Sequence, residues 1–364
     1  MMTDSSRSKT LELLKRLGEA HGAAGSEDSV RRIFREELGG LTIQPDRMGN
    51  LFCEKPGLCD RPRIMLAAHM DEVGFAVQSI TKTGLIKFSP LGGWWPHTLL
   101  AQRVRILTRA GSEILGIIGA KPPHFLQEAE RDRLMKLDDM FIDVGAGSRE
   151  EVLVELGIRL GDPIVPLSPF TPLSRPDLFV CKALDDRIGV ALTIQLIQEL
   201  ESRDHPNTVV AVATVQEEVG VRGAQTAAFT AKPDAAIVLE GAPADDFPGT
   251  SEEEQQGGLG RGAQIRLLDP SAIMNRRMVD LALHLAQTHQ IPHQLAVRKS
   301  GSTDARAIHL HGAGIPTMVL GVPARYIHTH NSILNVQDYA SALDLTLKLL
   351  MAMDSKTVES FMAF

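Results

Sequence analysis

Five apolar runs of the sequence end abruptly in ionisable side chains. Each ending by itself has an ordinary explanation, since histidines often lie in cores, acids cap helix N-termini and paired charges occur in solvated turns. Strand ends of one open α/β sheet, however, converge on a common edge. The five endings are LAAHMDEVG with His69 and Asp71, ALDDRIG with Asp185 and Asp186, VQEEVG with Glu217 and Glu218, VLEGAPADD with Glu240, and RYIHTHN with His328 and His330.

The combination of histidines and carboxylates at these endings indicates a divalent metal site. Four or more carboxylates gathered without a cation would repel one another and raise some of their pKa values. Lys182 and Arg187 are nearby in the sequence, but imidazole and carboxylate together suit zinc, cobalt or manganese better. Thiolate ligands are not expected, because Cys53, Cys59 and Cys181 form no C-x-x-C pair.

Counting charges predicts two metal ions. Asp185, Glu218 and Glu240 with a bridging hydroxide would carry four negative charges, which balance two dications. One histidine and one terminal carboxylate for each ion, with one shared carboxylate, then make a coherent site. Glu217 is left over. A hydrolase needs such a carboxylate, beside the metals but not bound to them, to move a proton from water to a leaving amine.

The elements that must position these residues alternate between strand and helix. After residue 172 the alternation is typical of a mostly parallel sheet with helices on both faces. Between residues 74 and 172, short strand-like pieces broken by glycine and proline predict a small β-barrel or sandwich. We therefore expect a catalytic α/β domain in two halves, residues 1–73 and 173–364, with a β-rich domain, residues 74–172, inserted between them.

Length and charge restrict the classes of function. A chain of 364 residues can bury a deep site, and its formal net charge of -7 supplies no basic stripe for a nucleic-acid backbone. The start has no apolar core of signal-peptide length, and nowhere do about 18 uncharged apolar residues run together. We expect a soluble cytoplasmic protein that binds neither nucleic acid nor membrane.

Several ordered motifs resemble those of the tetrahedral aminopeptidases, dinuclear metallopeptidases that include glutamyl, leucyl and lysyl aminopeptidases and relatives sometimes labelled cellulases. The similarity covers essentially the whole length and includes the family's long gap between the first histidine and the aspartate. It implies a zinc-peptidase-like α/β fold whose inserted domain builds dimer contacts. The motifs are AAHMDEVGF, GGWWPHTLLAQRVRI, GIIGAKPPH, ALDDRIG, VQEEVGVRGA, SGSTDA and VPARYIHTH.

Carried over residue by residue, the resemblance implies a role for each strand-end group. His69 resembles a ligand of one metal, with Asp71 as the carboxylate that orients its ring. Asp185 is similar to the carboxylate that bridges the two ions, and Glu217 is similar to the general acid/base. The remaining ligands implied are Glu218, Glu240 and His328.

Two of the strand-end positions depart from the family pattern. Relatives commonly have aspartate at position 240, and if the longer Glu240 is not a ligand, Asp245 or Asp246 is the alternative. His330 stands where a smaller residue is expected, and it either stacks near the site or is exposed.

The loop SGSTDARAIH resembles the family loop beside the substrate pocket. It implies Ser302 and Thr303 as pocket residues, and Arg325 of the VPARYIHTH motif is a further candidate. An equally good explanation is a helix start that is capped by Thr303 or Asp304.

The function implied is removal of the N-terminal residue from short peptides with a free N-terminus. Hydroxide held between the two metals would attack the first peptide bond, with Glu217 as general acid/base. The resemblance also implies a homododecamer, twelve subunits in a hollow tetrahedral shell. Two alternatives are a two-metal carboxypeptidase or deacylase, which needs no free amine, and a degenerate homologue that binds peptides without turnover. Neither the preferred side chain nor the identity of the metal follows from the sequence.

Overall fold

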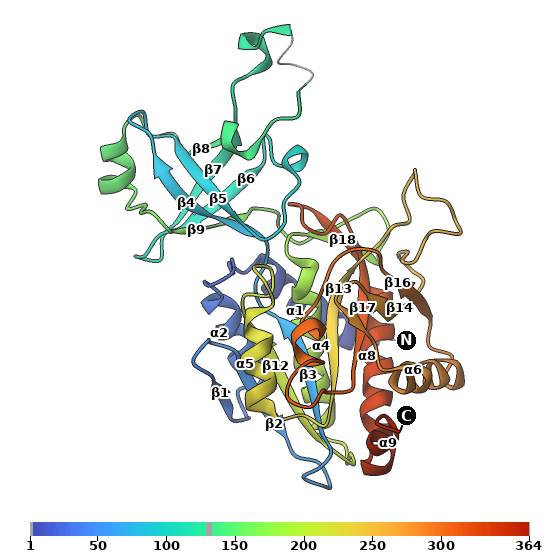
Figure 1. The fold of residues 1–364 in the computed structure, drawn as a ribbon. Coiled ribbons are helices and arrows are strands. Elements are labelled where there is room, and N and C mark those ends of the chain that lie inside the picture. The colour runs from blue at the N-terminus through green and yellow to red at the C-terminus, as the bar shows by residue number, and fades with distance from the viewer. Residues whose placement is uncertain (1–2, 129–132, 364) are drawn as a thin grey trace.

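The computed structural model describes residues 3–128 and 133–363. It has an α/β part built on a twelve-stranded sheet, and a closed six-stranded barrel that stands above one end of this part (Figure 1). The helices are α1 (Asp4–Glu19), α2 (Asp28–Glu37), α4 (Leu184–Leu200), α5 (Arg222–Ala231), α6 (Arg276–Thr288), α7 (Ala305–Ile308), α8 (Val336–Ala352) and α9 (Ser355–Ser360), with short turns of other helix types at Pro96–Thr98, Pro123–Phe125, Leu137–Asp139 and Glu151–Glu155.

The sheet of the α/β part is parallel at its centre and antiparallel toward its edges. Its main order is β1-β2-β12-β3-β13-β17-β18-β11-β10, and the parallel pairs of this path are β12·β3, β3·β13 and β13·β17. The strands are β1 (Ile43–Pro45), β2 (Leu51–Lys55), β3 (Arg63–His69), β10 (Thr171–Pro172), β11 (Leu178–Cys181), β12 (Thr208–Thr214), β13 (Ala235–Pro243), β14 (Ala263–Asp269), β15 (Ala272–Ile273), β16 (His293–Val297), β17 (Thr317–Arg325) and β18 (Ser332–Asn335).

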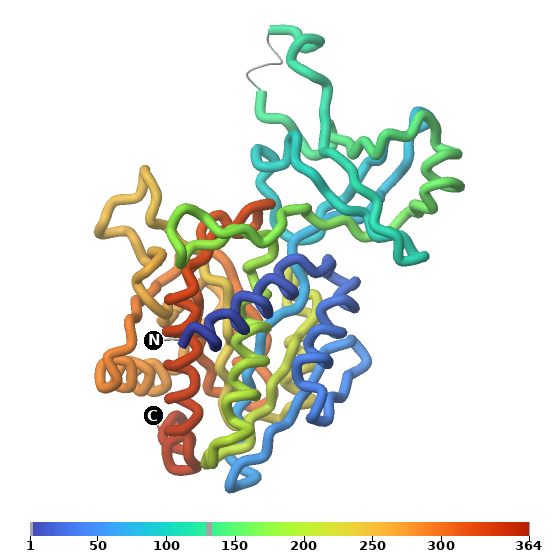
Figure 2. The backbone as a smooth tube through the Cα atoms, turned by 180° about the vertical axis from the view of Figure 1, so that it is seen from behind, coloured from blue at the N-terminus to red at the C-terminus, as the bar shows by residue number. Residues whose placement is uncertain are grey.

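The apolar runs of the sequence form the central strands. Every residue of β12 is buried, and so is every residue of β3 except Arg63 at its start. Such strands need cover on both faces. Helices α1, α4 and α8 lie over one face, seen from behind in Figure 2, while α5 and α7 pack together on the other. The expected α/β fold is confirmed, but the sheet is mixed rather than mostly parallel, because short strands fold back at its edges, as β1 does on β2.

The inserted region is a closed barrel with its own core. Strands β4 (Gly74–Ile80), β5 (Ile86–Leu91), β6 (Arg103–Leu107), β7 (Glu113–Gly119), β8 (Phe141–Asp143) and β9 (Pro163–Pro166) close in the order β4-β5-β8-β7-β6-β9. Its interior is filled by Phe75, Ile86, Ile106, Ile118 and Ile142, among others, separately from the core under the large sheet. The predicted barrel is therefore confirmed, while the domain limits at residues 74 and 172 stay a prediction.

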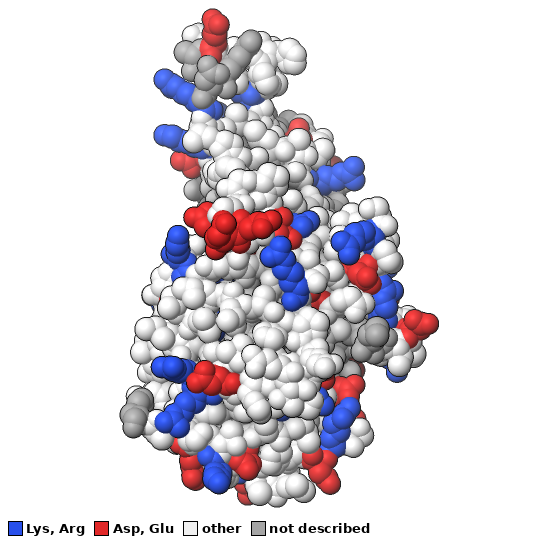
Figure 3. Space-filling view, turned by 90° about the vertical axis from the view of Figure 1, so that its right-hand side faces the viewer, with Lys and Arg blue, Asp and Glu red and all other residues white. Residues whose placement is uncertain are grey.

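The surface carries charges of both signs. On the face that Figure 3 shows, acidic side chains form a band across the middle and lysines and arginines are scattered around it. Within residues 3–128 and 133–363, no helix combines the length and the apolar character that crossing a bilayer requires.

Candidate active site

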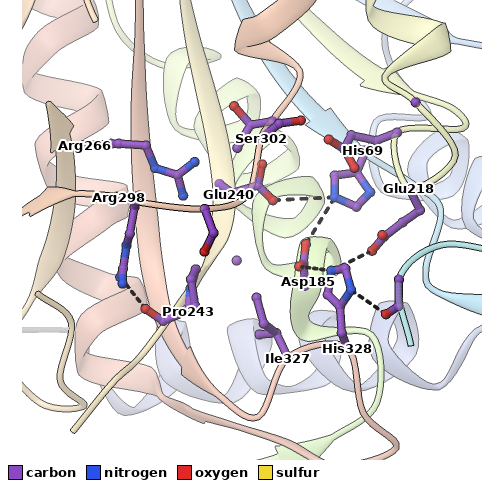
Figure 4. A pocket seen from close by; sticks show the side chains of 17 residues that line it. His69, Asp185, Glu218, Glu240, Pro243, Arg266, Arg298, Ser302, Ile327 and His328 are labelled. Atoms are coloured by element: carbon purple, nitrogen blue, oxygen red, sulfur yellow. Dashed lines mark hydrogen bonds and ion pairs between the residues drawn. The ribbon is translucent and has the colours of Figure 1, made fainter. Parts of the chain in front are cut away.

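Strand register brings the predicted residues to one edge of the sheet. His69 is the last residue of β3 and pairs with Thr214, the last residue of its parallel neighbour β12. The turn after β12 carries Glu217 and Glu218 to the same edge. Glu240 lies within β13. His328 follows the end of β17, which is the parallel neighbour of β13. Together with Asp185 at the start of α4, these side chains surround one cavity (Figure 4).

Two groups of potential metal donors share Asp185. His69, Asp185 and Glu240 offer one ligand atom each within 4.8 Å of one another, and Asp185, Glu218 and His328 do the same. Oδ1 of Asp185 lies 3.2 Å from Nε2 of His69, and its Oδ2 lies 3.4 Å from Nε2 of His328. The aspartate thus presents one oxygen to each imidazole, the arrangement that a bridging carboxylate requires.

Backbone carbonyls set the orientation of both imidazole rings. Nδ1 of His69 donates to the carbonyl of Asp71 at 3.0 Å, and Nδ1 of His328 donates to the carbonyl of Gly93 at 2.8 Å. With the proton on Nδ1, each Nε2 carries its lone pair toward the carboxylates, the form in which histidine binds a metal. The donor set, its spacing and the ring orientation therefore fit two divalent ions.

The carboxylate of Asp71 has a further task that the sequence did not indicate. Its Oδ1 lies 3.5 Å from Nδ1 of His69. This distance is longer than the 3.0 Å of the hydrogen bond that Nδ1 donates to the Asp71 carbonyl. The same carboxylate accepts hydrogen bonds from the backbone N–H groups of Glu217 and Glu218. Asp71 is completely buried, so it connects the end of β3 to the turn after β12.

The barrel contributes a backbone loop to the site. Gly92 follows β5 with a φ of 86°, and a Cβ at this position would lie 2.7 Å from Cγ1 of Val73 and 3.1 Å from Oε2 of Glu218. Only glycine combines this positive φ with such a close approach. The GGWW segment of the sequence therefore serves to bring the carbonyl of Gly93 to His328.

The electrostatics of the cluster show what a cation would relieve. Burial, followed by the charges of neighbouring carboxylates, raises the pKa of Glu218 to about 8 and that of Glu240 to about 7. Burial alone would lower the pKa of His328, but Glu218 and Asp185 raise it to about 10. Burial would raise the pKa of Asp185, but hydrogen bonds from Nε2 of His328 and His69, which donate when the rings are protonated in the absence of metal, outweigh burial and lower it. Carboxylates this perturbed in a cavity mark a site built for positive charge.

Glu217 lines the cavity but belongs to neither donor group. Burial raises its pKa well above the usual range, and the charge of Asp304 adds to this effect. Asp304 is buried, and its Oδ2 accepts a hydrogen bond from Thr214. The side chain of Asp304 does not cap α7, so the capping explanation for this residue is wrong.

The loop after β16 forms one wall of the cavity, which has a volume of about 280 Å³. Ser302 and Thr303 line it, as the resemblance implied, and Oγ1 of Thr303 also accepts a long hydrogen bond, 3.3 Å, from the N–H of Ala305. Arg325 does not line the cavity, because its guanidinium forms a bidentate pair with Asp246.

Three other positions are placed outside the donor groups. Asp245 and Asp246 pair with arginines and belong to neither donor group, whereas Glu240 belongs to the group with His69. His330 is buried beside Trp94, with 5.6 Å between ring centroids and an angle of 55° between the rings, so it is not exposed, and it packs against the tryptophan at a tilt rather than in a stack.

Two arginines in the cavity wall, Arg266 and Arg298, were not identified from the sequence. Arg266 lies inside β14, and Arg298 directly follows β16. Neither strand was predicted, although the rule that polar residues after strands gather at the site would have found Arg298 if residues 293–297 had been assigned as a strand.

Comparisons with known proteins agree with this geometry. The family model described as M42 glutamyl aminopeptidase matches residues 49–345. The glutamyl aminopeptidase of Lactococcus lactis subsp. cremoris is 34% identical over 95% of this chain and 97% of its own. The TET aminopeptidase of a marine sediment Thaumarchaeota archaeon superposes with a TM-score of 0.94 at 42% identity, covering 98% of this chain and 99% of that one. The TET1 peptidase of Pyrococcus horikoshii, described as able to assemble into a tetrahedron or a large octahedral shell, superposes with a TM-score of 0.85 at 31% identity, covering 94% of this chain and all of its own (100%).

Proposed function

Because the chain belongs to the M42 glutamyl aminopeptidase family, we propose that it is a two-metal aminopeptidase that removes the N-terminal residue of short peptides. The observation that carries this proposal is the pair of donor groups that share Asp185, with Glu217 beside them and outside both. A single-metal site would not need a carboxylate that faces two imidazoles with its two oxygens.

The proposed ligands are His69, Asp185 and Glu240 for one ion, and Asp185, Glu218 and His328 for the other. Divalent ions such as zinc, cobalt or manganese suit this nitrogen and oxygen donor set. When bound, they supply Lewis acidity, which polarises a carbonyl oxygen and lowers the pKa of water.

Glu217 performs the proton transfers in this proposal. Its carboxylate lines the cavity, so it can take a proton from the attacking water and return it to the nitrogen of the leaving amine. The backbone N–H of Glu217 is held by Asp71, which keeps the side chain beside the donor groups. Transfers of this kind are typically worth about 10²- to 10⁴-fold in rate.

A free N-terminus separates this activity from the deacylase alternative. The test is to strip the protein of metal, refill it with each of zinc, cobalt and manganese, and assay aminoacyl anilides against their N-acetylated forms. We expect hydrolysis that depends on metal and fails on the blocked substrates. Equal hydrolysis of blocked and free substrates would favour a deacylase, and no hydrolysis with any ion would favour a peptide-binding homologue.

We also propose that the chain assembles with copies of itself, since the TET1 peptidase of Pyrococcus horikoshii is described as able to assemble into a shell. The barrel is the part that we propose to form the contacts. The barrel region carries several large apolar side chains that are more than half exposed in the single chain, namely Leu115, Phe125, Leu134, Val154 and Leu160. Apolar exposure of this extent often marks a protein interface. Native mass spectrometry should give a homododecamer, and a monomer would rule out the assembly without affecting the chemistry.

A further inference from the structure

The wall of the cavity away from the donor groups is cationic. Arg266 and Arg298 line it, on the opposite side from His69 and Glu218 in Figure 4. Serines and glycine of the loop 300–303 continue this wall. Among the described lining residues, only Pro243 and Ile327 have apolar side chains larger than a methyl group. A leucine-like side chain would therefore find little apolar surface to pack against.

Each arginine is held by its own aspartate. Nη1 of Arg266 donates to Asp269 at 3.2 Å, and Nη1 of Arg298 donates to Asp245 at 3.2 Å. Nη2 of Arg298 is further fixed by the carbonyl of Pro243. These bonds position the guanidinium groups before any ligand binds, and a positioned donor loses less entropy on binding.

Both guanidinium groups keep unused donors. Within the described residues, the Nε atoms of Arg266 and Arg298 are buried and have no hydrogen-bond partner. The Arg266 side chain is only 4% exposed, so water does not satisfy its unpaired donor as it would at the surface. Buried donors without an acceptor cost free energy, so stability alone does not account for these two arginines.

The dimensions of the cavity suit one residue of a peptide. A volume of about 280 Å³ is near the lower end of the range for small-ligand sites, roughly 300–1,000 Å³. The donor groups occupy one side, where the peptide bond must lie for the proposed reaction. The side chain of the N-terminal residue then extends toward the opposite wall.

We infer that Arg266 and Arg298 select peptides whose N-terminal residue is glutamate or aspartate. A carboxylate there accepts charge-assisted hydrogen bonds from the guanidinium groups, whereas a lysine side chain is repelled by them. The inference rests on the proposed function, since that function places the N-terminal residue in this cavity. Family membership alone does not decide the matter, because the resemblance extends to glutamyl, leucyl and lysyl enzymes.

The first test compares glutamyl and glutaminyl anilides on the unaltered protein. The two substrates have nearly the same shape and differ in charge, so the ratio of their kcat/KM values measures the contribution of the carboxylate. We expect a ratio of at least about tenfold in favour of glutamyl, and lower values still for leucyl and lysyl anilides. A leucyl or lysyl substrate that exceeds glutamyl would overturn the inference while supporting the proposed function.

Arg298→Gln tests the assignment to a residue. It should bring the ratio down to about one to threefold, because the glutamyl substrate loses more kcat/KM than the glutaminyl substrate. Arg261→Gln is the matched control, because Arg261 is exposed, pairs with Gln255 and lies outside the cavity. If Arg298→Gln keeps the full ratio of glutamyl to glutaminyl kcat/KM, the inference is contradicted. The comparison on the unaltered protein remains valid even if this variant fails to fold.

A binding measurement separates the inference from the proposed function. Calorimetric titration with free L-glutamate and L-glutamine should give a Kd at least about tenfold lower for glutamate, and Arg298→Gln should reduce the difference to about one to threefold. If no anilide is hydrolysed but glutamate binding still depends on Arg298, the proposed function fails while the preference of this cavity for a carboxylate is supported. If glutamate and glutamine bind equally, the inference fails whatever the activity.

Discussion

Oδ1 of Asp71 accepts a hydrogen bond of 2.9 Å from the backbone N–H of Glu217. The other carboxylate oxygen accepts one of 3.0 Å from the next N–H, that of Glu218. A buried acid on the loop after β3 thus fixes the turn after β12, and both glutamates receive their positions from it. The two catalytic strands are coupled through this side chain as well as through their ladder.

Asp71→Asn is expected to impair turnover while leaving the fold intact. The amide group would have to present its own N–H₂ to one of the two backbone N–H groups, so one bond is lost and the turn shifts. Changes to groups that orient metal ligands typically cost about 10- to 100-fold in affinity or activity. The measurement is kcat, together with the zinc content of the same sample. An Asp71→Asn variant with full kcat would contradict the role given to this carboxylate.

Metal removal should make stability strongly dependent on pH. The folded, metal-free protein has raised pKa values at Glu218, about 8, and Glu240, about 7, so it binds more protons than the unfolded chain above pH 4.5, their ordinary pKa. His328, with a pKa of about 10, acts in the same direction above its ordinary value of 6.5. The unfolding free energy of the metal-free protein therefore falls as pH rises through this range.

The corresponding measurement is thermal unfolding with and without zinc at about pH 5.5 and about pH 8. Zinc needs the deprotonated ligands, so the rise in Tm that it causes should be clearly larger at the higher pH. Comparing the same protein with and without metal cancels the titration of distant groups. A zinc-induced rise that is equal at both values would contradict the assignment of these residues as ligands.

Glu240→Ala should separate the two donor groups. It removes one of three ligands from the group with His69, while the group of Asp185, Glu218 and His328 keeps all of its members. We expect the metal content at a low, buffered concentration of free zinc to fall from two ions per chain toward one. A variant that still binds two ions tightly would show that Glu240 is not a ligand.

Much of the site could be predicted because its side chains come directly after apolar runs. A parallel sheet brings the ends of β3, β12, β13 and β17 to one edge, so His69, Glu217, Glu218 and His328 follow from the pattern alone. The β-rich insertion could also be predicted, from the spacing of its glycines and prolines. Its closure into a barrel depends on pairing between β4 and β9, which are far apart in the chain.

The rest of the site depends on backbone geometry and backbone groups, which cannot be inferred from the types of the residues. The carbonyls of Asp71 and Gly93 orient the two imidazoles, and any residue has a carbonyl. Asp185 and Asp186 are adjacent in sequence but differ in task. Asp186 accepts bonds from the N–H groups of His69, Gly189 and Gly241, and only the folded backbone distinguishes it from its neighbour.

Glu217 and Glu218 have different roles in the proposed mechanism, since Glu217 transfers protons and Glu218 binds metal. The two carboxylates are consecutive, and only Glu218 falls within a donor group. Replacing each with glutamine changes nearly the same atoms at nearly the same place, so each variant is the control for the other.

The most direct test measures metal content by mass spectrometry and kcat on the same samples of Glu217→Gln and Glu218→Gln. We predict that Glu217→Gln keeps two ions per chain and loses at least about 10²-fold in kcat, whereas Glu218→Gln loses metal. If Glu217→Gln loses its metal, or if both variants keep metal and full activity, the two glutamates do not divide the work in this way.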